Sequence, residues 1–166
     1  MATDINHDTI KSAIVTILTA NEGAGSAIYD ISGGSNKLRS ILVGYPHGGD
    51  PLQDTSANFA FVTNENLTEE LKPAGAVVSN AMKAIMHTIR YQIVFVMQDE
   101  TPRKTEVIMD TIQQGIMELL EADHDLGGTV HDSYPERVET MIPEKTAGRT
   151  KQGRKITLRC TVITGD

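Results

Sequence analysis

The sequence is poor in the residues that cross-link small domains or fill large aromatic cores. Among 166 residues there is no tryptophan, and there are only three phenylalanines and a single cysteine, Cys160. One cysteine excludes an intramolecular disulfide and is typical of a reducing compartment. Because Cys160 stands in an alternating apolar run, we interpret it as a small strand residue rather than a reactive thiol. The core must therefore be mainly aliphatic.

Long hydrophobic runs are also missing. No apolar stretch approaches the roughly 20 residues that span a bilayer, and the first residues lack the pattern of a secretory signal. We therefore expect a soluble protein made in a cytoplasm. The formal net charge of -7 argues against a polyanion-binding chain as a whole. The length of 166 residues predicts one α+β domain, residues 1–166, with a core of its own.

Motifs for catalysis are scarce as well. The sequence has no Gly-x-Ser-x-Gly elbow, no P-loop and no dinucleotide fingerprint. His124-Asp125 and His131-Asp132 form two pairs of metal-ligand type, which leaves a metal-dependent hydrolase as one hypothesis. Two glycines lie between the pairs, so one pair is expected to end a helix and the other to begin a strand. We therefore predict no metal, no cofactor and no enzymatic activity.

The strongest positive pattern lies between residues 82 and 121. From 85 to 97 every second residue is apolar with one exception, which predicts a half-buried strand. The spacing then changes to that of a helix face, and Thr101 and Pro102 suit the N-cap and the first helical position. The predicted strand face is Ile85, His87, Ile89, Tyr91, Ile93, Phe95 and Met97. The predicted helix stripe is Val107, Ile108, Thr111, Ile112, Gly115, Ile116, Leu119 and Leu120.

Shorter patterns flank this unit. An apolar stripe predicts a helix over Asp8–Leu18, capped by Asp4 or Asp8. We expect residues 27–31 and 38–43 to form a hairpin. Further strands are predicted at 59–63, at 129–142 with an irregular middle at Tyr134-Pro135, and at 156–163.

Three polar stretches separate these elements. We interpret residues 44–58 and 144–155 as loops, and 64–80 as a projecting loop, a hairpin or a short helix. The order of elements predicts an α+β fold. It consists of a mainly antiparallel sheet with two helices packed on one face and long projecting loops.

A basic stretch falls in the last of these loops. Residues 145–155 hold five of the fifteen cations of the chain, opposed only by Glu144. Such a stretch is either a solvated hairpin tip or a positive prong that meets an acidic partner or a phosphate backbone. No aromatic residue interleaves it, so stacking on bases is not supported. The candidate partner-binding residues are Lys145, Arg149, Lys151, Arg154 and Lys155.

The order of these segments resembles a known family. The matching parts are the opening helix 10–18 followed by Ile28-Tyr29, the strand 87–96 that leads into the helix 106–120, the segment 126–130, and the closing segment 153–159. In this layout the chain resembles the tail-terminator, or tail-completion, proteins of long-tailed phages and related archaeal viruses. The resemblance covers nearly the whole chain and is one of pattern, without a short diagnostic motif.

The resemblance implies a structural virion protein without catalysis. Members of that family form a hexameric ring on the head-proximal end of the tail tube and join it to the neck. The implied partners are copies of the chain itself, the tail-tube protein, a neck or head-completion protein and, transiently, genomic DNA in the lumen. The implied location is the virion tail, and the host cytoplasm during assembly, with no membrane partner. Two alternatives remain: another neck component, or a small-molecule-binding domain in which residues 44–58 cover a pocket beside His87.

Overall fold

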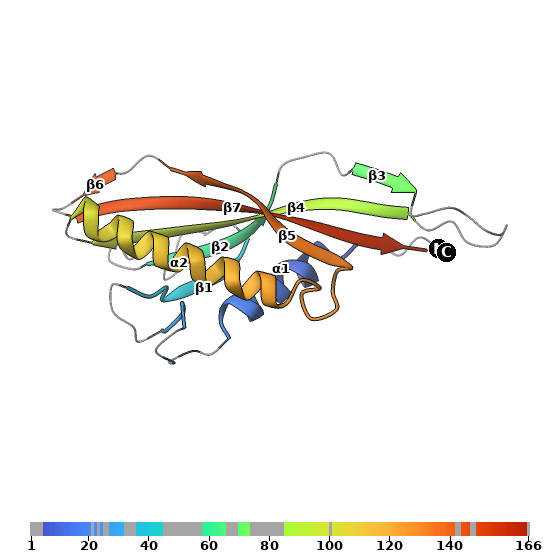
Figure 1. Ribbon diagram of the computed structural model, residues 1–166, viewed down its shortest axis with the longest axis horizontal. Helices are drawn as coiled ribbons and strands as arrows, with labels where there is room; N and C mark the ends of the chain where they lie inside the picture. The colour runs from blue at the N-terminus through green and yellow to red at the C-terminus, as the bar shows by residue number, and fades with distance from the viewer. Residues whose placement is uncertain are drawn as a thin grey trace.

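The computed structural model describes residues 5–20, 22, 24, 27–31, 36–44, 58–65, 70–73, 85–99, 101–141, 144–146 and 149–165. These residues form one sheet and two helices, and the predicted α+β fold is confirmed (Figure 1). The elements are α1 (His7–Leu18), β1 (Ser40–Val43), β2 (Phe59–Asn64), β3 (Glu70–Pro73), β4 (Ile85–Asp99), α2 (Pro102–Ala122), β5 (Asp132–Thr140), β6 (Glu144–Thr146) and β7 (Arg149–Thr164).

The two longest strands form the centre of the sheet. The strand order is β1-β2-β4-β7-β5, with β3 beside one end of β4 and β6 beside the opposite end of β7. β4 and β7 are antiparallel over their full lengths, from Ile85 opposite Thr164 to Asp99 opposite Thr150. This ladder runs along the long axis of the molecule (Figure 1). Every pair of neighbouring strands is antiparallel except β1 and β2.

Both helices pack on the same face of the sheet. One hydrophobic cluster joins buried residues of α1 and α2 with the odd-numbered residues of β4 from Ile89 to Met97. The alternation predicted for this strand is therefore confirmed over that range. Ile85 is 39% exposed because it lies at the far end of the β4–β7 ladder, beyond the helices. Neither described helix is apolar enough along its length to cross a membrane.

The start of α2 is as predicted, but its buried stripe is rotated. Thr101 is the N-cap and accepts a hydrogen bond from the Lys104 amide, and Pro102 is the first helical residue. Val107, predicted in the stripe, is 60% exposed. The Thr105 hydroxyl donates to the Thr150 carbonyl of β7 at 3.3 Å, which turns that side of the first helical turn toward the sheet. The buried residues are Thr105, Met109, Ile112, Ile116 and Leu120.

The predicted hairpin over residues 27–43 is wrong. Tyr29 and Leu38 form a single parallel bridge, and β1 then pairs with β2, also in parallel. The Leu38 amide donates to the Ile28 carbonyl at 2.8 Å and the Asp30 amide donates to the Leu38 carbonyl at 2.9 Å, as in a parallel pair. The apolar pattern indicated β1, but residues 27–31 form only the single bridge at Tyr29 and no strand, and the pattern did not determine the parallel direction.

Two smaller predictions need correction. The cap of α1 is Asn6, whose side chain accepts from the Thr9 amide at 3.0 Å, while Asp8 lies inside the first turn. Residues 144–155 are not a loop throughout, because β6 and the start of β7 form an antiparallel hairpin there. The predicted loop 44–58 lies outside the described residues apart from its two ends. Of 64–80, the structure describes 64–65 and the strand β3.

The turn between α2 and β5 explains the glycine pair. Leu126, Gly127 and Gly128 have φ angles of 51°, 67° and 84°, in the left-handed region that glycine adopts most easily. The Asp123 and Asp125 carboxylates accept hydrogen bonds from the amides of Gly127 and Gly128. The irregular middle predicted for the next strand is confirmed, since β5 shifts register between Pro135 and Arg137.

One glycine in α2 is required by close packing. A Cβ added at Gly115 would lie 2.3 Å from Cγ2 of Ile28, the residue that precedes the Tyr29 bridge. Ile28 is only 5% exposed, and its branched side chain has little freedom to move aside. Gly115 therefore allows α2 to approach the 27–31 segment.

We predict that Gly115→Ala destabilises the protein by about 1–3 kcal/mol, because the added methyl overpacks this contact. An alanine in an unconstrained helix would instead stabilise by about 1 kcal/mol. Urea denaturation measures the change, with Gln114→Ala on the exposed side of α2 as the control. Combining Gly115→Ala with Ile28→Ala should remove most of the Gly115→Ala penalty. A stabilising Gly115→Ala in the otherwise unchanged protein would contradict the packing argument.

Candidate interaction surface

The sheet has a second face, opposite α1 and α2, which we call the open face because neither helix covers it. Some of its residues are nevertheless buried, among them Thr88, Val94, Val96, Gln98 and Thr157. It carries the even-numbered residues of β4 and the odd-numbered residues of β7, because successive side chains in a strand point to opposite sides. The cross-strand register places these residues in rows over β4, β7 and β5. The rows are Arg90, Arg159 and Tyr134, then Gln92, Thr157 and Arg137, then Val94, Lys155 and Glu139.

Ion pairs between strands cover much of this face. The Arg90 guanidinium donates to both carboxylate oxygens of Glu136, at 2.7 and 3.3 Å, and thereby lowers the pKa of Glu136. Arg137 donates to Glu65 at 2.8 Å, and the Glu65 side chain is only 10% exposed. These pairs link β4, β5 and the residue after β2, so they hold guanidinium groups in fixed positions on the surface.

Three further cations of the open face lie on β7. The Lys155 ammonium is 2.7 Å from a Glu139 oxygen, and this contact lowers the pKa of Glu139. The Lys151 ammonium lies 5.7 Å from the centre of the Phe59 ring, within the range of a cation–π interaction. Arg159 donates to the Tyr134 hydroxyl at 2.8 Å and lies over its ring.

The open face is positively charged although the whole chain is negative. The described side chains of this face comprise five cations (Arg90, Arg137, Lys151, Lys155 and Arg159) and four carboxylates (Glu65, Asp132, Glu136 and Glu139), a local charge of +1. The formal charge of the chain is -7. A surface with the sign opposite to that of the molecule favours contact with an acidic partner.

A shallow groove of about 490 Å³ crosses the open face. Met141, which follows β5, is 48% exposed at its edge. Gly153 lies beneath this methionine, since an added Cβ would come within 2.7 Å of the Met141 sulfur. The groove is therefore lined by both apolar and polar side chains. Its lining residues are Phe61, Thr63, Gln92, Val94, Glu139, Thr140, Met141 and Lys155.

The five predicted partner-binding residues do not all lie on the same side of the sheet. Lys151 and Lys155 lie on the open face. Arg154 lies on the helix side, where it is 9% exposed and contacts Asp110 at 2.6 Å and Gln113 at 2.7 Å on α2. Lys145 pairs with Thr150 in the backbone register and Arg149 with Thr146, but their side chains are outside the described part. The structure therefore places Lys151 and Lys155 on the open face and Arg154 in a contact between β7 and α2.

Three cations of the open face were not predicted from the sequence: Arg90, Arg137 and Arg159. They lie on three strands that are distant in the sequence, and only the sheet register brings them together. One signal was present, because Lys151, Lys155 and Arg159 recur every four residues in what proves to be a single strand.

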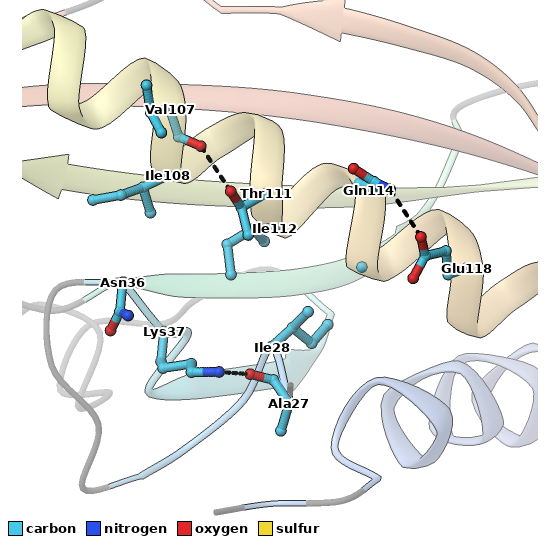
Figure 2. A pocket seen from close by; sticks show the side chains of 11 residues that line it. Ala27, Ile28, Asn36, Lys37, Val107, Ile108, Thr111, Ile112, Gln114 and Glu118 are labelled. Carbon is cyan, nitrogen blue, oxygen red and sulfur yellow. Dashed lines mark hydrogen bonds between the residues drawn. The ribbon is translucent and has the colours of Figure 1, made fainter. Parts of the chain in front are cut away.

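A second groove, of about 470 Å³, lies beside α2 (Figure 2). The dashed lines there mark three hydrogen bonds. The Lys37 ammonium donates to the Ala27 carbonyl, the Thr111 hydroxyl to a helix carbonyl at 3.0 Å, and the Gln114 amide to Glu118 at 2.9 Å. This groove therefore extends the outer surface of α2 and does not converge polar groups on one point.

The two predicted His-Asp pairs lie at the end of α2 and the start of β5. His124 and Asp132 approach to 3.2 Å, and both side chains are more than half exposed. Among the described residues, no group of three or more histidine, cysteine, aspartate or glutamate side chains is arranged to hold a metal ion.

His87 contacts the Thr164 hydroxyl at 2.7 Å, and the buried Tyr91 hydroxyl contacts His7 of α1 at 2.8 Å.

Cys160 lies in the core, on the helix side of β7, and is fully buried. Burial raises the pKa of its thiol to about 12, with a smaller contribution from Asp132. The interpretation of Cys160 as a strand residue is therefore confirmed.

No protein-family model and no curated protein matches this chain. The open face is thus defined by geometry and charge alone.

We predict different outcomes for Arg154→Ser and Lys151→Ser. Arg154→Ser should destabilise the fold by about 1–3 kcal/mol, because it removes a mostly buried side chain and its hydrogen bonds to α2. Lys151→Ser should change stability by no more than about 0.5 kcal/mol, as for most surface positions. Thermal and urea denaturation of both variants measure the difference. Equal effects at the two positions would contradict the placement of Arg154.

A second prediction concerns Cys160. Its thiol should resist alkylation by iodoacetamide at pH 8 in the native protein and react once urea unfolds the chain. The pKa of this thiol is about 12 in the folded state, whereas the pKa of an unperturbed cysteine is 9.0. As the pH rises, the thiol therefore ionises first in the unfolded state. The free energy of unfolding should fall as the pH rises from 9.0 to about 12. The Cys160→Ala variant, which lacks this ionisation, is the control. Rapid alkylation without denaturant would contradict the burial.

Proposed function

We propose that the protein is a structural component of a virion, a tail terminator. Copies of the chain assemble into a hexameric ring that caps the head-proximal end of the tail tube and joins it to the neck. The observation that carries this proposal is the open face, a positively charged sheet surface held by ion pairs between strands. The order of helices and strands, which resembles that family, gives it a second support.

The open face has the physical properties of a preformed recognition surface. Its charged groups sit on a sheet rather than on loops, so little side-chain freedom is lost when a partner binds. Three of the five cations are held in ion pairs with carboxylates of neighbouring segments, so their charged groups are already positioned before a partner binds. Charge complementarity of this kind sets partner choice and the rate of encounter.

A closed ring requires two unlike surfaces on each copy, because its contacts are heterologous. The open face and the helical layer are unlike in both shape and charge. The hairpin of β6 and β7 lies at the Asp99–Thr150 end of the central ladder, apart from the middle of the open face. In the proposed ring this hairpin, with the predicted Lys145 and Arg149, docks the tail-tube or neck protein and transiently contacts DNA in the lumen.

We predict that the full chain forms a closed ring in solution. Light scattering and mass photometry should give a hexamer, and negative-stain electron microscopy should show a central lumen. Raising the salt concentration should weaken assembly, because the Debye length falls from about 10 Å at 0.1 M to about 3 Å at 1 M. A chain that stays monomeric at all concentrations, also after addition of a tail-tube protein, would contradict the proposed function.

A further inference from the structure

The outer surface of α2 has a charge pattern that opposes helix stability. Its first turn contains no acidic residue and its last turn no basic residue. Arg103 and Lys104 lie near the positive end of the helix dipole, whereas Glu118 and Glu121 lie near the negative end. Side chains of these signs normally occupy the opposite ends, where they offset the dipole. The negative end of α2 therefore lacks compensation from its own side chains.

This surface is also the exposed side of the helix. Val107, Thr111, Gln114, Glu118 and Glu121 recur at helical spacing and are all exposed. Val107 leaves 60% of its surface in solvent. The stripe borders the groove shown in Figure 2. Val107 lies between the basic start of the helix, at Arg103 and Lys104, and its acidic end, at Glu118 and Glu121.

The open face offers the complementary pattern. Lys151, Lys155 and Arg159 follow one another along β7 at intervals of four residues, or about 13 Å. The groove beside them exposes Met141, a flexible apolar side chain that adapts to a partner surface. A line of cations with an apolar groove thus lies on one side of the molecule, and a helix with acidic residues and an exposed valine lies on the other.

We propose that the outer face of α2 in one copy docks onto the open face of the next copy. The acidic end of α2 meets the cations of β7, and Val107 is covered in the contact. This contact is heterologous, so repetition of it gives a closed ring or an open filament. The inference rests on the proposed self-assembly and adds the two surfaces that meet. A second copy is the occupant that the charges favour, because the same chain carries both complementary patterns.

Charge reversal on each side tests the docking. Glu118→Lys alters α2, Lys151→Glu alters the open face, and Asp8→Lys on α1 is the matched control because it changes the net charge as much as Glu118→Lys does. Each single reversal at the interface should raise the concentration needed for half-assembly by about tenfold or more, which corresponds to one strong charge contact. Asp8→Lys should leave that concentration within about threefold of the unaltered protein.

Restoration is the decisive observation. The double variant Lys151→Glu with Glu118→Lys pairs opposite charges again and should assemble within about threefold of the unaltered protein. A mixture of equal amounts of the two single variants should also assemble, with the variants alternating around the ring. Circular dichroism verifies folding of every variant. Should a reversal unfold the chain, Glu118→Gln replaces it, with a smaller loss expected.

The outcomes separate the two proposals. An unaltered chain that never assembles contradicts the proposed function and the docking together. If the unaltered chain assembles, two results overturn the docking alone. The first is that the single charge reversals impair assembly no more than Asp8→Lys does. The second is that the folded double variant and the mixture fail to recover assembly. Loss in both single variants and recovery in the double variant and the mixture supports it.

Discussion

The antiparallel ladder between β4 and β7 is the constraint on which the rest of the structure depends. Its register runs from Ile85 opposite Thr164 to Asp99 opposite Thr150 without interruption. Both strands therefore keep one side-chain alternation over their whole lengths. A shift of one residue would move every core side chain to the surface and every surface charge into the core. The core on one face and the charges on the other are consequences of the same register.

The helices depend on this ladder as well. α2 is attached to β7 by the Thr105–Thr150 hydrogen bond at its start and by the contacts of Arg154 with Asp110 and Gln113 further along. These polar contacts supplement the apolar cluster that joins the helix to β4. They also fix which side of α2 faces solvent. The exposed stripe that we place in a contact between copies is thus determined by how the opposite side packs.

The helices and one face of the sheet share a single hydrophobic cluster, and the proposed function uses the surfaces outside it. The open face displays its charges from strands, and the proposed ring uses that face together with the helix on the other side. In such an assembly the functional unit is the contact between copies rather than a cleft in one copy. Of the two grooves described above, one borders α2 and the other, on the open face, is lined by both polar and apolar side chains.

The sequence by itself determined the elements that depend on local spacing. The alternation around Phe95, the N-cap at Thr101 and the irregular middle of β5 are encoded within a few residues, because side-chain period and capping are local properties. Only the tertiary structure decided which strands are neighbours. It placed Arg90, Arg137 and Arg159 on one face, made β1 parallel to β2, and turned Arg154 away from the surface toward α2. Such pairings are long-range, since they follow from burial of the whole apolar surface and leave no mark in the spacing of a single segment.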